Sequence, residues 1–130
     1  MPAKSPDHTE TRIATVAMDE NGIIVITMKD CGIIDEYDVM DLNLVIRHLS
    51  GQQPVRKLLV STAEFELTNK AKEMAEKEDA MSSTVARAVV VSNNIKASVL
   101  NFIKKFSEKS YPQQFFNNRE EAYNWLLEQR

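Results

Sequence analysis

Residues 23–28, which read Ile-Ile-Val-Ile-Thr-Met, constrain the fold more than any other part of the chain. Nearly every position in this run is apolar and β-branched, so the side chains do not separate into an alternating apolar and polar set. A strand of this composition is typical of a sheet that is covered on both faces. The preceding dipeptide, Asn21-Gly22, favours a two-residue type I′ turn. The sequence therefore predicts an antiparallel hairpin, with its first strand within residues 12–19 and the second strand more deeply buried.

Beyond the hairpin, helical and extended patterns alternate to the end of the chain. Asp35 is a favourable N-cap for a helix that ends at Gly51, where glycine readily adopts the left-handed conformation. Thr68 and Asn118 are favourable N-caps for two later helices. The sequence therefore predicts helices over residues 36–50, 69–81, about 95–106 and 119–129, and strands over residues 56–60, 85–92 and 113–116.

The predicted order is β-β-α-β-α-β-α-β-α, which places the chain in the α/β class. Strands that alternate with helices need crossover connections, and they become parallel neighbours in one sheet. We expect a single mixed sheet that begins with the antiparallel hairpin and has the helices packed on it. Residues 11–130 should form this one domain, whereas residues 1–10 have no periodic pattern and are expected to be a disordered tail.

Length and charge argue against several classes of protein. A chain of 130 residues is the size of one domain, and its net charge of −3 argues against a dedicated nucleic-acid binder. No apolar run approaches the ~20 residues of a membrane-spanning helix, so no integral membrane segment is expected. Cys31 is the one cysteine, which excludes an internal disulfide, and residues 1–10 lack the apolar core of a signal peptide. These features favour a cytoplasmic location.

The sequence lacks the residue patterns that support catalysis or cofactor binding. Its three glycines lie far apart, so there is no glycine-rich phosphate loop. Cys31 has no histidine near it in the sequence, although it precedes a helix N-terminus that would favour a thiolate. The acidic residues between Asp30 and Asp41 suit the positive end of a helix dipole better than a site for a hard cation. We therefore expect a non-enzymatic protein with no catalytic residues, cofactor or metal.

Several positions taken together resemble a known family. They are Gly22-Ile23-Ile24 at the start of a strand, Pro54 before a buried strand, an Ala-Val-Val-Val strand that ends in Ser92, and the closing residues Phe116, Glu121-Ala122 and Trp125-Leu126. With these positions the chain resembles the small bacterial STAS/SEC14-like (SpoIIAA-like) domain proteins. Their fold is that of anti-sigma-factor antagonists and the related lipid-exchange domains. The resemblance covers about residues 11–130, and it implies this fold and, for most members, no assigned activity.

The resemblance also suggests one candidate switch residue. In anti-sigma-factor antagonists, a serine at the start of the helix after the central strand is phosphorylated, within an Asp-Ser-x-Gly-type motif. Thr68 is the nearest hydroxyl at the corresponding helix start of this chain. The aspartate before it and the glycine after it are both absent, so Thr68 matches only the hydroxyl of that motif.

Three hypotheses for the function follow. The preferred one is a regulatory module that binds a protein partner or a second copy of itself, with Met74 and Met81 of the sparsely apolar helix 69–81 as the contact surface. The alternative is a carrier or sensor of an apolar, lipid-like ligand in a pocket between the sheet and the helices. For the residues of such a pocket, a simple filled core is the preferred interpretation. The third is a small hydrolase or redox enzyme that uses Cys31. The candidate pocket residues are Phe102, Ile103, Phe106, Phe115 and Trp125.

Overall fold

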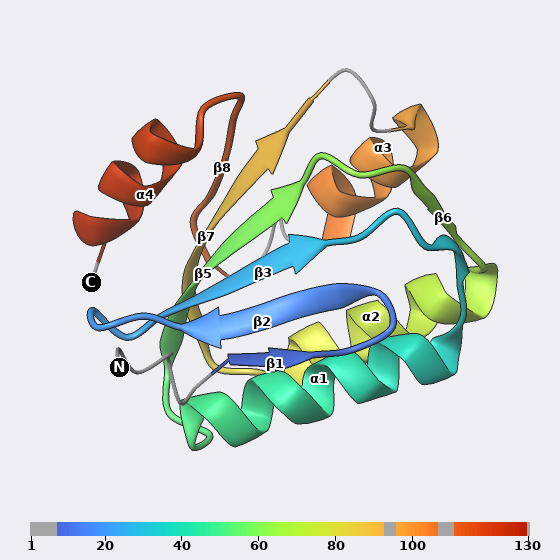
Figure 1. Cartoon of the computed structure of the whole chain (residues 1–130), viewed down its shortest axis with the longest axis horizontal. Coiled ribbons are helices and arrows are strands. Elements are labelled where there is room, and N and C mark those ends of the chain that lie inside the picture. The colour runs from blue at the N-terminus through green and yellow to red at the C-terminus, as the bar shows by residue number, and fades with distance from the viewer. Residues whose placement is uncertain (1–7, 93–95, 107–110, 130) are drawn as a thin grey trace, which may run out of the picture.

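The computed structural model describes residues 8–92, 96–106 and 111–129. Within these ranges a six-stranded sheet carries four helices, and a separate two-stranded sheet is also present (Figure 1). The strands of the large sheet are β1 (His8–Glu10), β2 (Ala14–Met18), β3 (Ile23–Met28), β5 (Val55–Ser61), β7 (Thr84–Val91) and β8 (Gln113–Phe116). The small sheet consists of β4 (Gly32–Ile34) and β6 (Phe65–Leu67). The helices are α1 (Glu36–Ser50), α2 (Asn69–Met81), α3 (Ala97–Phe106) and α4 (Arg119–Leu127).

The large sheet is mixed and has the order β1-β2-β3-β5-β7-β8. Strands β1, β2 and β3 pair antiparallel, whereas β3, β5, β7 and β8 are parallel neighbours. Helices α1, α2 and α3 form the crossover connections that parallel pairing requires. The predicted α/β class, the N-terminal hairpin and the mixed sheet are therefore confirmed.

The hairpin turn differs from the predicted type I′ turn. Gly22 has a φ of +76°, but Gln52 is the one non-glycine residue with a positive φ in the described part of the chain, so Asn21 does not adopt the left-handed conformation. The carboxylate of Asp19 accepts hydrogen bonds from the N–H groups of Asn21 and Ile23, both at 2.9 Å. This side chain stabilises a longer turn, because Asp readily bonds to the backbone that follows it.

Two further parts of the sheet structure were not predicted. The expected tail lies partly outside the described residues, but residues 8–10 form β1, which pairs with β2 in the register His8 to Ala17 and Glu10 to Thr15. The prediction of disorder is thus wrong for these three residues. Strands β4 and β6 pair in parallel beyond the ends of β3 and β5. Segments this short, with polar or mixed side chains, carry too little periodic pattern to be recognised in sequence.

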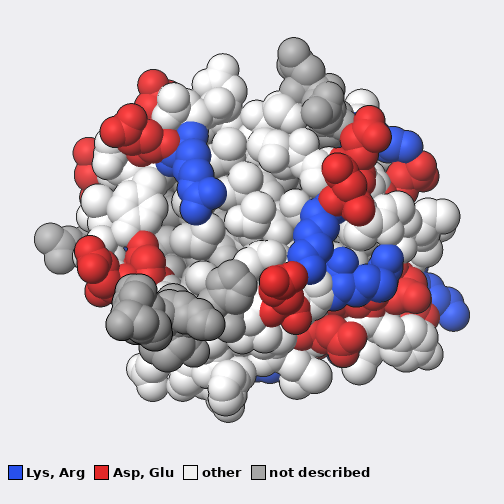
Figure 2. All heavy atoms as spheres, viewed as in Figure 1, with Lys and Arg blue, Asp and Glu red and all other residues white. Residues whose placement is uncertain are grey.

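The helices cover the two faces of the sheet unequally. Helices α1, α2 and α3 pack with one face in a core that includes Ile24, Ile26 and Val89. Helix α4 packs on the other face against β5, β7 and β8. Beside α4, an area without charged side chains lies in the middle of the view in Figure 2. The cavity described below lies on the face with three helices.

The capping residues define where three of the helices begin. The Asp35 side chain accepts hydrogen bonds from the N–H groups of Tyr37 and Asp38, and the Asp38 carboxylate accepts one from the N–H of Asp35. Thr68 accepts from the N–H of Ala71, and Asn118 accepts from the N–H of Glu121. These caps satisfy donors that have no partner inside the helix. The predicted starts of α1, α2 and α4 are confirmed.

The C-terminal helix is held on the sheet by Ala122 and Leu126 rather than by its tryptophan. Ala122 and Leu126 are the fully buried residues of α4. Trp125 is half-buried and packs against Phe116, with 5.9 Å between the ring centres. Residues 122 and 126 lie one helical turn apart and face the sheet directly, whereas Trp125 lies at the margin of this contact.

Candidate functional site

Polar side chains lie beneath helices α1, α2 and α3, on strands that are otherwise apolar. Lys57 and Ser61 belong to β5, and Arg87 belongs to β7. Lys57 and Arg87 are each only 6% exposed, and Ser61 is fully buried. Lys57 and Arg87 are also paired in the parallel register of β5 and β7. Neighbouring strands lie ~4.8 Å apart, so these two cationic side chains leave the same face of the sheet next to each other.

These polar groups line a cavity of about 130 Å³ between the sheet and the three helices. Its walls are otherwise almost entirely apolar, with Leu59 on the sheet and Phe102 and Ile103 on α3. A filled core was the preferred interpretation of the sequence, whereas the structure has a cavity here. The other lining residues are Ile13, Ile26, Met28, Ile34, Val39, Leu42, Asn43, Ile46, Phe65, Leu67, Ala75, Asp79 and Val99.

A hydrogen-bonded group holds the polar end of the cavity in place. Arg87 donates from Nε to Oε1 of Gln113 at 2.6 Å, and its guanidinium lies 5.7 Å from the centre of the Tyr111 ring. The Tyr111 hydroxyl donates to Oδ1 of Asp79 at 2.6 Å. A guanidinium over an aromatic face is attracted by the ring quadrupole. Arg87 and Asp79 are therefore both fixed by Tyr111, from β7 and α2 respectively.

Burial shifts the pKa values of the cationic groups at this site. Burial in the apolar surroundings lowers the pKa of Lys57 from 10.5 to about 8; the charge of Arg87 lowers it further, and Asp79 opposes the shift. Burial also lowers the pKa of Arg87 and raises that of Tyr111. The site thus holds two buried cationic side chains close to one carboxylate, which is an expensive arrangement in a medium of low dielectric constant.

Lys57 and Ser61 have unused hydrogen-bonding capacity. Neither the Lys57 ammonium nor the Ser61 hydroxyl forms a hydrogen bond with any residue in the described ranges. The two residues lie on the same face of β5, because side chains alternate between the faces of a strand. Buried polar groups are usually hydrogen-bonded, so a bound molecule is a natural partner for them.

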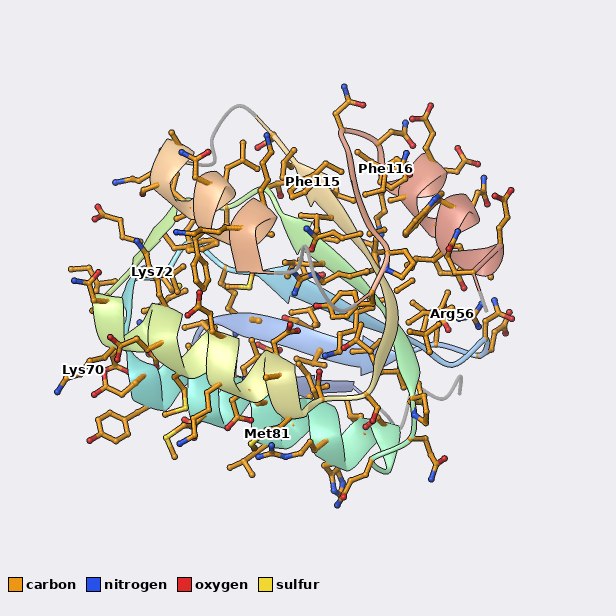
Figure 3. All side chains as sticks on the ribbon, turned by 180° about the vertical axis from the view of Figure 1, so that it is seen from behind. Arg56, Lys70, Lys72, Met81, Phe115 and Phe116 are labelled. Atoms are coloured by element: carbon orange, nitrogen blue, oxygen red, sulfur yellow. The ribbon has the colours of Figure 1, made fainter. Side chains whose placement is uncertain are left out.

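Phe102 separates the cavity from a polar surface groove between α2 and α3. It lines both, and the groove is otherwise polar, with Lys72 and Glu76 on α2 and Asn101 and Lys105 on α3. Figure 3 shows Lys72 in the space between these two helices. Lys57 likewise lines a second surface depression, near Met81. The cavity therefore approaches the surface on two sides.

The five candidate pocket residues are divided by the sheet. Phe102 and Ile103 line the cavity, whereas Phe115 packs against the same core without lining it. Trp125 lies on the opposite face with α4, so it cannot line this cavity. Figure 3 shows the side chains of Phe115 and Phe116 on different sides of β8, Phe116 being near α4, because consecutive strand residues point to opposite faces. The side chain of Phe106 lies outside the described residues.

The candidate interaction and switch residues have mixed surroundings. Met74 is partly buried and packs against the core, whereas Met81, at the end of α2, is 63% exposed (Figure 3). The Thr68 hydroxyl caps α2 through the N–H of Ala71, at 3.0 Å. The two methionines thus do not form one exposed surface, and the Thr68 hydroxyl is engaged in a structural hydrogen bond.

Cys31 and the acidic residues near it in the sequence have structural roles. Burial raises the pKa of the Cys31 thiol, which disfavours the reactive thiolate. Asp38 forms an ion pair with Arg12, 2.6 Å from Nη2 to Oδ2, and this pairing lowers the pKa of Asp38 to about 2. Asp30 accepts a hydrogen bond from the N–H of Glu64. Over the described ranges, no grouping of His, Cys, Asp and Glu side chains is suited to hold a metal ion.

Lys57 and Arg87 were not among the candidate residues, although their positions in the sequence indicate a special environment. Lys57 and Arg87 each interrupt an apolar strand at a position that should face the core. Charged residues are almost never fully buried unless they are paired, so a charge at such a position marks a special environment. The pattern predicted the strands but not that these two would be neighbours, which depends on the register.

The fold and the cavity together define a class: an α/β protein with one mixed sheet, three helices over a cavity on one face and a fourth helix on the other. The sequence matches a protein family described as a domain of unknown function (DUF7793) over residues 17–130, and the chain belongs to this family. None of the curated proteins matches the chain. In the part of the chain that the structure describes, none of the helices is both long and apolar enough to cross a bilayer.

Proposed function

We propose that the protein is a non-enzymatic binding module that holds a small, largely apolar molecule in the cavity between the sheet and helices α1, α2 and α3. The observation that supports this function is the cavity itself, which has apolar walls and a few converging polar groups. Such a composition is typical of sites for small molecules. The resemblance to lipid-exchange domains agrees with this proposal. We also propose a cytoplasmic location, because the one cysteine of the chain is not available for an internal disulfide.

The volume of the cavity restricts the size of the ligand. Core cavities of roughly 150 Å³ bind benzene, so a space of about 130 Å³ suits a molecule of similar size. A whole membrane lipid is far larger. The candidate ligands are therefore short-chain or single-ring compounds rather than whole lipids.

Filling the cavity tests this function. Ala75 of α2 lines the cavity, and Ala80 of the same helix is exposed. We expect toluene, benzamide or benzoate to raise the thermal unfolding midpoint of the wild type, because a ligand that binds only the folded state stabilises it. Ala75→Leu should abolish this increase, and Ala80→Leu should retain it. If none of the three probes stabilises the wild type, or if Ala75→Leu responds fully, the proposed function is wrong.

A second candidate function, association with a protein partner or a second copy of the chain, is favoured by the outer face of α1. Tyr37, Met40 and Leu44 are 66%, 40% and 56% exposed and lie at helical spacing, with Ile33 (64% exposed) just before the helix. An exposed apolar stripe of this kind is typical of interaction surfaces. It replaces Met74 as the candidate surface, since Met74 is engaged in the core.

A further inference from the structure

We propose that the ligand of the cavity is a small organic acid, whose single negative charge is bound by Lys57 beside Arg87. This inference rests on the proposed function and names the chemical class of its ligand. It is drawn from the charge, burial and bonding of the residues at one end of the cavity.

Lys57 is a buried cation without a partner among the described residues. Its side chain lies on the floor of the cavity with only 6% of its surface exposed, and it forms neither a hydrogen bond nor an ion pair with any described residue. An ammonium group carries three donors and no acceptor, so its partner must supply an acceptor oxygen or nitrogen. Hydrogen bonds in which both partners are charged are the shortest and strongest, so a carboxylate is preferred to a neutral carbonyl.

The charged groups around the cavity restrict the charge of its ligand. The charged side chains that line the cavity, within the described ranges, are Lys57, Arg87 and Asp79. Asp79 already accepts the hydrogen bond from Tyr111, and α2 supplies it from the side opposite the sheet. Lys57 is the cation of this group that has no hydrogen-bonded or ion-paired partner among the described residues, so one negative charge on the ligand matches its charge. A dianion, such as a phosphate monoester, would leave an excess of negative charge in surroundings that solvate charge poorly.

The cavity has a cationic part and an apolar part. The cationic side chains leave β5 and β7 at one end, and α3 contributes Val99, Phe102 and Ile103 to the apolar part of the wall. A ligand with a carboxylate at one end and a ring or a short branched chain at the other matches this division. The small volume requires both ends to belong to one compact molecule.

Benzoate and benzamide provide a matched pair of probes, because they have the same shape and differ in charge. By calorimetric titration at pH 7, we expect benzoate to bind the wild type at least about tenfold more tightly than benzamide, as a charged hydrogen bond contributes more than a neutral one. Lys57→Met should remove this preference, because it takes away the ammonium that distinguishes the carboxylate from the amide. Lys105→Met removes an exposed lysine of α3 and should retain the preference.

The outcomes separate this inference from the proposed function. Binding of benzamide or toluene without a preference for benzoate would overturn the inference and leave the function standing. A preference for benzoate that survives in Lys57→Met would also overturn it, provided that circular dichroism shows the variant to be folded. If Lys57→Met is not folded, Lys57→Gln takes its place. Absence of binding by every probe would contradict the function itself.

Discussion

Lys57 is a charged side chain kept almost entirely out of water, and its burial carries a cost that depends on pH. Below pH ~8 the ammonium is protonated in both the folded and the unfolded chain, so the full cost of burying it is present. Between pH ~8 and 10.5 the folded chain has released a proton that the unfolded chain still holds. The contribution of Lys57 therefore makes the folded state more stable as the pH rises through this interval.

This reasoning predicts that Lys57→Met stabilises the protein at pH 7 by roughly 1–3 kcal/mol, with the gain shrinking toward pH 10. Urea unfolding of both proteins at pH 7 and pH 10 measures this difference in the free energy of unfolding.

The charged groups that face Lys57 are Arg87 and Asp79 at the cavity and Arg47 at the neighbouring depression, where Arg47 is paired with Glu78. Comparing wild type with variant cancels contributions common to both, including the raised pKa of Tyr111. The exposed Lys77→Met should show no such trend, and a destabilised Lys57→Met at pH 7 would refute the account.

At the scale of the elements, two neighbouring leucines of α4 contribute differently to the stability of the protein. Leu126 is fully buried against the sheet, whereas Leu127 is 43% exposed. We expect Leu126→Ala to lower the free energy of unfolding by about 2–4 kcal/mol, because it leaves a cavity in the core. Leu127→Ala should cost less than about 1 kcal/mol. Chemical denaturation followed by tryptophan fluorescence measures both, and equal effects would show that α4 is not fastened through Leu126.

The elements also show what a sequence can predict. Helices α1, α2 and α4 were predicted at their first residue, because Asp35, Thr68 and Asn118 are local signals that act within one turn. Strands β1, β4 and β6 were missed because only their pairing partners make them strands. The candidate pocket residues show the same limit: Phe102 and Ile103 share a helix that faces the cavity, but Trp125 was assigned to the pocket without knowledge of which face α4 covers.

At the scale of the whole molecule, the exposed stripe on α1 predicts self-association. We expect the wild type to form a dimer whose population rises with concentration, because burying Tyr37, Met40 and Leu44 against a second copy removes apolar surface from water. Leu44→Glu should make the protein monomeric, as seen by light scattering coupled to size-exclusion chromatography. Leu127→Glu changes an exposed leucine on α4 and should leave the dimer intact. A wild type that remains monomeric at every concentration would remove this surface from consideration.

The walls of the cavity come from residues 13 to 103, on the sheet and on three separate helices. No short segment of the chain contains the site, so a bound molecule can contact all of its walls only after these elements have packed together. Such contacts are absent from a partly folded transition state, and stabilising them slows unfolding more than it speeds folding. The natural ligand would therefore also lengthen the lifetime of the folded protein, and its supply in the cell would influence how long each copy escapes degradation.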